Sequence, residues 1–108
     1  GNPKGVLYSH RSTVLHALIQ CFYNSGSFAP KKKILPIVPL FHANAWGIPY
    51  SAPISGTSLV FPGANLDGKS VYDLLEKYSV NSAWGVPTVW MGLLEEIAER
   101  GGKKPDGL

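Results

Sequence analysis

Ile34-Leu35-Pro36-Ile37-Val38 is a short, nearly continuous apolar run, and it decides how the rest of the chain is arranged. A run of this kind is typical of a β-strand covered on both faces, because a strand with one face in water alternates apolar and polar residues. Pro36 and Pro39 predict that the strand is short or lies near an edge of its sheet, since proline donates no ladder hydrogen bond. We therefore expect a short buried strand with other elements packed on both of its faces.

The segment before this strand predicts a helix. Ser9 is a suitable N-cap for a helix over about residues 10–23. Apolar residues four apart, together with their neighbours, predict one broad buried stripe along it, formed by Val14, Leu15, Leu18, Ile19 and Phe22. Just upstream, Val6-Leu7-Tyr8 has the composition of a short strand.

The segment after the 34–38 strand continues the alternation. Prolines and glycines between Phe41 and Gly56 predict a kinked helix rather than an unbroken one. The remaining elements are a strand at 57–61, a helix capped by Asp67 with Val71, Leu74, Leu75 and Tyr78 facing inward, a strand at 82–86, and a helix that opens at Pro87 or Thr88 and stops at Gly101-Gly102. Strands that alternate with helices are typical of α/β proteins around a mostly parallel sheet. We therefore expect the fold class α/β, with a single unit over residues 1–108.

The charges of the chain do not indicate a nucleic-acid partner. The net charge is +3, but the lysines cluster at 31–33 and 103–104 without interleaved aromatic residues. Cys21 is the only cysteine, so a reducing compartment is favoured and its thiol is expected to fill a small space in the core. No apolar run reaches the ~18 residues that cross a bilayer. We expect a cytoplasmic protein without a transmembrane segment, and the sequence does not decide its oligomeric state.

Two features favour a piece of a longer polypeptide. The chain begins with a glycine turn rather than with Met, and a strand and a helix follow at once. Only 16% of the residues are charged while 11% are aromatic, which is unusual for a small free-standing domain. We expect missing neighbours to cover apolar faces of this segment.

Gly1-Asn2-Pro3-Lys4-Gly5 is the first candidate site. Small residues let backbone N–H groups approach phosphate oxygens, and Lys4 adds a mobile positive charge. The loop is not of the kind in which Lys precedes Ser or Thr at the start of a helix, because a strand is expected next. A phosphate-binding loop and a plain surface turn both remain open on these residues.

His42 and Trp46 form the second candidate site. His42 follows the 34–38 strand, and ligands of α/β proteins gather at the carboxyl ends of strands. A neutral imidazole there either bonds a carboxylate or carbonyl of a ligand or is satisfied by the backbone. Trp46 lies in a segment rich in small residues, where it either lines or blocks an apolar channel or packs in the core.

Gly85-Val86-Pro87-Thr88 stands at the end of another expected strand. Gly85 removes a side chain where a ligand could pass and Thr88 can cap the next helix, but a tight structural turn explains the same residues. His10 and His16 have no Cys, Asp or Glu at ligand spacing, so no metal site is predicted.

Four motifs in register resemble the adenylate-forming (AMP-binding) enzymes. In chain order they are Gly1–Val6, Ser9-His10-Arg11, Pro39-Leu40-Phe41-His42 and Gly85-Val86-Pro87-Thr88. The runs Phe41–Gly47 and Val86–Trp90 are most similar to the medium- and long-chain fatty acyl-CoA synthetases. The resemblance covers essentially the whole chain and implies an internal fragment of the N-terminal domain of such an enzyme.

The resemblance implies an acid–thiol ligase that uses ATP, Mg²⁺ and CoA to convert a fatty acid into acyl-CoA through an acyl-adenylate, releasing AMP and pyrophosphate. It implies catalytic roles for Lys4 and His42, and a phosphate-binding loop formed by Gly1, Asn2, Pro3, Lys4 and Gly5. It further implies a fatty-acid site that includes His42, Trp46, Gly85, Val86, Pro87 and Thr88. The adenine, metal and lid motifs of the family are expected outside this segment, so the segment alone is expected to be inactive.

Two other functions remain open. One is a non-catalytic module that binds an apolar ligand such as a lipid, and it would bind fatty acid without ATP. The other is a ligase of the same superfamily for aryl or amino acids, in which Trp46 and the wall residues would shape a shorter pocket.

Overall fold

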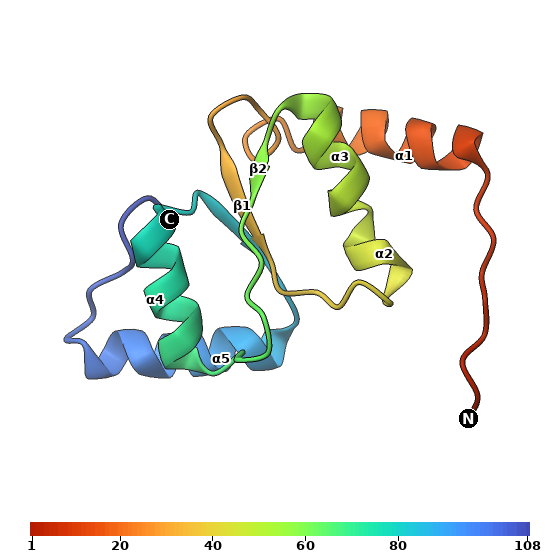
Figure 1. Cartoon of the computed structure of the whole chain (residues 1–108). Coiled ribbons are helices and arrows are strands. Elements are labelled where there is room, and N and C mark those ends of the chain that lie inside the picture. The colour runs from red at the N-terminus through yellow and green to blue at the C-terminus, as the bar shows by residue number, and fades with distance from the viewer.

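The computed structural model describes all residues from 1 to 108 and has a three-stranded parallel sheet at its centre (Figure 1). The strands are β1 (Lys33–Pro36), β2 (Ser58–Leu59) and β3 (Ser82–Trp84), in the order β2-β1-β3. Ile34 of β1 lies opposite Leu59 on one side and Ser82 on the other. The predicted α/β class with a parallel sheet is therefore confirmed.

The strand expected at 34–38 is short, as predicted, but it is central and not an edge strand. Pro36 is tolerated there because β2 pairs only with Lys33 and Ile34, so no β2 residue lies opposite the proline. Beyond Pro36, the N–H groups of Ile37 and Val38 both donate to the Trp84 carbonyl, at 2.7 and 3.2 Å. A proline at the end of a strand therefore does not require an exposed edge when the neighbouring strand ends first.

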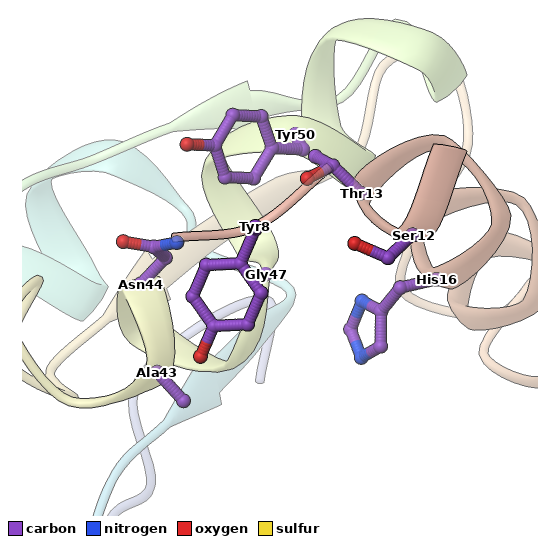
Figure 2. A pocket seen from close by; sticks show the side chains of 8 residues that line it. All are labelled: Tyr8, Ser12, Thr13, His16, Ala43, Asn44, Gly47 and Tyr50. Carbon is purple, nitrogen blue, oxygen red and sulfur yellow. The ribbon is translucent and has the colours of Figure 1, made fainter. Parts of the chain in front are cut away.

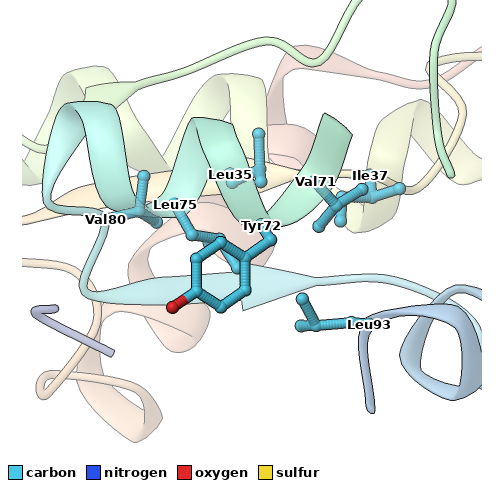
Figure 3. Close-up of a cluster of buried hydrophobic side chains, with 7 residues drawn as sticks. All are labelled: Leu35, Ile37, Val71, Tyr72, Leu75, Val80 and Leu93. Atoms are coloured by element: carbon cyan, nitrogen blue, oxygen red, sulfur yellow. The ribbon is translucent and has the colours of Figure 1, made fainter. Parts of the chain in front are cut away.

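Two hydrophobic clusters cover the two faces of the sheet. Neighbouring residues of a strand point to opposite faces, and Ile34 and Leu35 of β1 accordingly belong to different clusters. Leu35 packs with side chains of α4 (Gly68–Tyr78) and α5 (Pro87–Glu99), as Figure 3 shows. Ile34 packs on the other face against Phe28 and residues of α3 (Ile48–Ser55).

The first helix, α1 (His10–Tyr23), has the predicted bounds and cap. The Ser9 hydroxyl accepts from the Ser12 N–H at 3.0 Å. The predicted buried stripe is wrong, because its members are about half exposed or more: Val14, Leu15, Leu18, Ile19 and Phe22. Instead α1 packs on α3 through a narrow side that carries Ala17 and Gln20, since a small residue lets two helices approach closely.

The segment before α1 forms no strand. Residues 1–9 have no regular structure and run away from the body of the molecule (Figure 1). Leu7 is almost fully exposed, so the expected strand at 6–8 is wrong. Strand propensity alone does not hold a strand without a partner to accept its hydrogen bonds.

The helix expected to be kinked between Phe41 and Gly56 is divided in two. A short turn, α2 (Ala43–Trp46), is followed by Gly47 and then by α3. All four residues of α2 have positive φ, between 46° and 57°, so this turn is left-handed. Gly47 joins it to α3 at φ 80°, a conformation that glycine adopts without steric cost.

The two C-terminal helices follow the sequence closely. The Asp67 carboxylate accepts from the Ser70 N–H and caps α4, while Gly101 and Gly102 at positive φ end α5. The N-cap of α5 is Val86, so Thr88 does not cap it. Val71 and Leu75 are buried as expected, whereas Tyr78 is 40% exposed. None of the helices has both the length and the apolar character that crossing a membrane requires.

Candidate functional site

A cavity of about 230 Å³ lies between the start of α1 and the α2–α3 segment. Figure 2 shows its lining residues, which are Tyr8, Ser12, Thr13, His16, Ala43, Asn44, Gly47 and Tyr50. The α2 turn follows β1 within a few residues, so the cavity lies on the carboxyl side of the central strand. This is the side of a parallel sheet on which ligands usually bind.

One wall of the cavity is a polar face of α1. Ser12 and His16 are four residues apart, and therefore lie one above the other on the helix surface. The hydroxyls of Ser12 and Thr13 donate to the Ser9 carbonyl, at 3.0 and 3.1 Å, which leaves their lone pairs available as acceptors. This wall can therefore orient a polar ligand group.

The facing wall is the left-handed α2 turn with Gly47. A left-handed conformation costs about 1–2 kcal/mol per non-glycine residue, so four in succession require support from their surroundings. Ala45 is completely buried, which supplies part of that support. A Cβ atom at Gly47 would lie 2.6 Å from the His16 ring, so the absence of a side chain lets α1 and α2 close on each other.

Two tyrosines stand at the opening of the cavity. Tyr8 and Tyr50 come from different segments and are each about half exposed. In the view of Figure 2 their rings lie between Asn44 on one side and the α1 side chains Ser12 and His16 on the other. Aromatic rings with a hydroxyl end are suited to a site that is apolar inside and wet at its rim.

The structure places His42 and Trp46 next to the cavity but not on its lining. His42 is the N-cap residue of α2; its side chain is exposed and its N–H donates to the Pro39 carbonyl at 3.0 Å. It directly precedes the lining residue Ala43. Trp46 is partly buried at the other end of the turn. The predicted contacts of both residues with a ligand remain predictions.

The proposed phosphate loop lies on the exposed N-terminal arm. Residues 1–5 do not line the cavity, and only Tyr8 connects the arm to it. A Cβ atom at Gly1 or Gly5 would meet nothing within 4 Å, and Lys4 forms no ion pair. Free backbone N–H groups beside a free ammonium group are the donor set that a polyphosphate requires, so these residues fit the tail of ATP in their chemistry.

Gly85, Val86, Pro87 and Thr88 lie beside the end of β1 rather than on the cavity. The Gly85 carbonyl accepts from the Trp90 indole N–H at 3.2 Å. A Cβ atom at Gly85 would come within 3.1 Å of the Trp90 ring and 3.3 Å of Ile37. These contacts pack the turn at Gly85 tightly against Trp90 and Ile37. A role of these residues in a ligand channel stays a prediction.

Several lining residues were not found from the sequence. The sequence motifs predict no site role for Ser12, Thr13, Asn44 or Tyr50, and they concern His16 only as a metal ligand. The sequence does hold one signal for this wall. Ser12 and His16 are polar and four residues apart on a helix with an apolar stripe, which indicates a separate polar face. Across residues 1–108, no three His, Cys, Asp or Glu side chains lie together in a way that could hold a metal ion.

The charged groups with shifted pKa values lie away from the cavity, on α4 and α5. The Asp73 carboxylate accepts from Lys69 at 2.7 Å and from Arg100 at 2.9 Å. These two hydrogen bonds lower the pKa of Asp73 below its ordinary value. The pKa of the Arg100 guanidinium is raised by its hydrogen bonds to Glu96 and Asp73. This network joins α4 to the C-terminal end of α5 and contributes no group to the cavity.

Comparison with known sequences assigns the chain to a family. The profile of the AMP-binding enzyme family matches residues 1–106, and the chain belongs to this family. The resemblance inferred from the four motifs is therefore confirmed.

Individual relatives are CoA ligases. The chain is 52% identical over 103 residues to the medium-chain-fatty-acid–CoA ligase of Ectopseudomonas oleovorans, covering 95% of this chain and 19% of the relative. It is 48% identical over 101 residues to the 3-methylmercaptopropionyl-CoA ligase of Ruegeria pomeroyi and 43% identical over 101 residues to the long-chain-fatty-acid–CoA ligase of Thermus thermophilus; each match covers 94% of this chain and 19% of the relative. The chain thus spans about a fifth of the length of the curated relatives it matches.

Proposed function

We propose that this chain forms part of the N-terminal domain of an ATP-dependent fatty acyl-CoA synthetase. Such an enzyme joins a fatty acid to CoA through an acyl-adenylate and releases AMP and pyrophosphate. The observation that carries the proposal is the 52% identity to a medium-chain-fatty-acid–CoA ligase over 95% of this chain. The cavity on the carboxyl side of β1 supports it, because it combines aromatic rings with a few polar groups.

In this proposal the cavity accepts part of the acyl chain. Tyr8, Ala43 and Tyr50 offer apolar surface, while His16 and Asn44 offer hydrogen-bonding groups. His42, one residue before the lining, is assigned to the carboxylate head of the fatty acid. Trp46 and the segment 85–88 are assigned to the channel of the alkyl tail.

The exposed arm is assigned to ATP. The Lys4 ammonium group and the backbone N–H groups of Gly1, Asn2, Lys4 and Gly5 would contact the β- and γ-phosphates, where fixed donors stabilise charge that develops during adenylation. ATP supplies the activated phosphorus, Mg²⁺ neutralises phosphate charge and CoA supplies the thiol. The ligands of Mg²⁺ are assigned to parts of the parent enzyme other than residues 1–108. The parent enzyme is assigned to the cytoplasm.

A shorter acid is the second candidate substrate. Two relatives at 48% and 47% identity are 3-methylmercaptopropionyl-CoA ligases, named for a small thioether acid. The identities of the two groups differ by only a few per cent, so a direct comparison of both acids is part of the test. A lipid carrier without ligase activity gains no support from these relatives.

Segment exchange tests the proposal. The homologous 103 residues of the Ectopseudomonas oleovorans ligase are replaced by this chain, and octanoyl-CoA and 3-methylmercaptopropionyl-CoA formation are measured. We expect the exchanged enzyme to remain a ligase and to lose at least about tenfold in kcat/KM when Lys4→Ala or His42→Ala is added. A matched Lys31→Ala variant, in an exposed loop, should leave kcat/KM unchanged.

Two results would contradict the proposal. One is a folded exchanged enzyme that makes neither thioester, and the other is activity that is indifferent to both Lys4→Ala and His42→Ala. The chain alone is expected to form no acyl-adenylate above background, and turnover by the purified 108-residue protein would overturn that expectation.

A further inference from the structure

Gln20 is a buried polar side chain of α1 that bonds to the α2–α3 segment. It is 9% exposed and lies one helical turn after the lining residue His16. Its Nε2 donates to the carbonyl of Trp46 at 2.9 Å, and its Oε1 accepts from the hydroxyl of Ser51. One amide therefore contacts the last residue of the left-handed turn and the first half of α3.

The segment held by Gln20 is the one whose backbone conformation is least favourable. Ala43, Asn44, Ala45 and Trp46 all have φ near +50°. Such a conformation persists only where surrounding contacts determine it, and these positions are common at functional sites. Within the turn the Gly47 N–H donates to the Asn44 carbonyl at 3.0 Å, and the Ser51 N–H donates to the Gly47 carbonyl at 3.1 Å.

Losing the Gln20 amide would remove the hydrogen bond to the Trp46 carbonyl and the shorter of the two bonds of the Ser51 hydroxyl. The Ser51 side chain is completely buried, and its remaining contact is a longer one of 3.3 Å to the Gly47 carbonyl. Polar groups that lose a partner away from water are unfavourable. The turn and α3 would therefore shift so that these groups form hydrogen bonds with water or with each other. Because Ala43, Asn44 and Gly47 line the cavity, its shape would change with them.

We propose that Gln20 is a positioning residue that fixes the left-handed turn and thereby the acyl-facing wall of the cavity. Gln20 acts through the Trp46 carbonyl and the Ser51 hydroxyl and does not line the cavity itself. The assignment of the cavity to the acyl chain rests on the proposed function. The two hydrogen bonds by which Gln20 holds the turn, here called the clamp, do not depend on it.

The first experiment uses the exchanged ligase that carries this chain, without ligand. Gln20→Met keeps the length and packing of the side chain and removes its donor and acceptor. We expect amide hydrogen exchange at Gly47 and Ser51 to accelerate by at least about tenfold, while exchange at Val80, on the far face of the sheet, stays unchanged. Leu18→Gln, on the exposed side of the same helix, should alter none of these rates.

The second experiment measures octanoate affinity from the NMR shifts of the cavity residues. Gln20→Met should weaken binding by about tenfold. Ser51→Ala retains the bond to the Trp46 carbonyl and should weaken binding less. This graded loss distinguishes positioning from general destabilisation, which would move the Val80 exchange rate as well.

Wild-type exchange at Gly47 together with wild-type octanoate affinity in Gln20→Met would overturn the inference. If Gln20→Met does not fold, the wild-type protein decides: the Gln20 side-chain amide protons should show nuclear Overhauser contacts to the amide of Gly47, and their absence would refute the clamp. If wild-type protein binds no octanoate, the acyl assignment fails, and the exchange experiment still decides the role of Gln20.

Discussion

At the scale of single residues, the cavity depends on the absence of a side chain at Gly47. Gly47 has φ 80°, and a Cβ atom there would lie 2.6 Å from two atoms of the His16 ring. The imidazole thus packs directly on the backbone that joins α2 to α3. Both walls of the site meet at this residue.

Gly47→Ala is expected to destabilise the protein and to deform the cavity. The positive φ alone costs about 1–2 kcal/mol for a residue with a Cβ, and the contact with His16 adds to it. Urea denaturation measures the free energy of unfolding. Gly63→Ala is the matched control, because Gly63 also has positive φ (+70°) but open space around it. Equal losses in the two variants would show that His16 does not press on position 47.

At the scale of elements, two glycines let α4 and α5 cross in contact. A Cβ atom at Gly68 would lie 2.1 Å from the Gly92 carbonyl oxygen, whereas one at Gly92 would lie 3.6 Å from the nearest Gly68 atom. The crossing is therefore asymmetric. It packs α4 against α5 over the cluster that contains Leu35 and Leu75 (Figure 3).

Gly68→Ala and Gly92→Ala are expected to affect the free energy of unfolding differently. Gly68→Ala forces the two helices apart and should lower the free energy of unfolding by about 1–3 kcal/mol, as overpacking does. Gly92→Ala makes an ordinary contact and gains helix propensity, so it should be neutral or stabilising by up to about 1 kcal/mol. Thermal unfolding of both variants checks this. Similar destabilisation by both would mean that the helices do not cross at these residues.

At the scale of the whole molecule, the ion pairs gather on one side of the sheet. The four ion pairs all join residues of α4, α5 and the segment that follows α5, with Asp73 bound to both Lys69 and Arg100. The α1 side carries the exposed apolar stripe instead. Stability towards acid therefore depends on the α4–α5 side.

Stability is expected to fall in acid through Asp73. Its pKa is lowered in the folded protein from an ordinary value of 3.8, so its contribution is present above that value and is lost as the pH falls through the folded pKa. Asp73→Asn should lower stability at pH 7 and flatten the pH profile below 3.8, as followed by circular dichroism in urea. Glu99→Gln, at an exposed carboxylate without an ion pair, should keep the wild-type profile. A profile for Asp73→Asn as steep as that of the wild type would contradict the role of Asp73.

The sequence by itself determined the elements whose signals are local. The caps at Ser9 and Asp67, the glycine stop after α5 and the alternation of strands and helices follow from hydrogen bonds and periodicity within a few residues. The four motifs likewise identified the family, because they are read along the chain.

Only the tertiary structure decided which surfaces meet. The central place of β1, the outward stripe of α1 and the clamp of Gln20 on Trp46 each depend on a partner distant in the sequence. Hydrophobic periodicity shows that a helix has an apolar side, but packing against small and polar residues such as Ala17 and Gln20 can bury a different side. The cavity was missed for the same reason, since its two walls lie some thirty residues apart and face each other only once Gly47 lets them close.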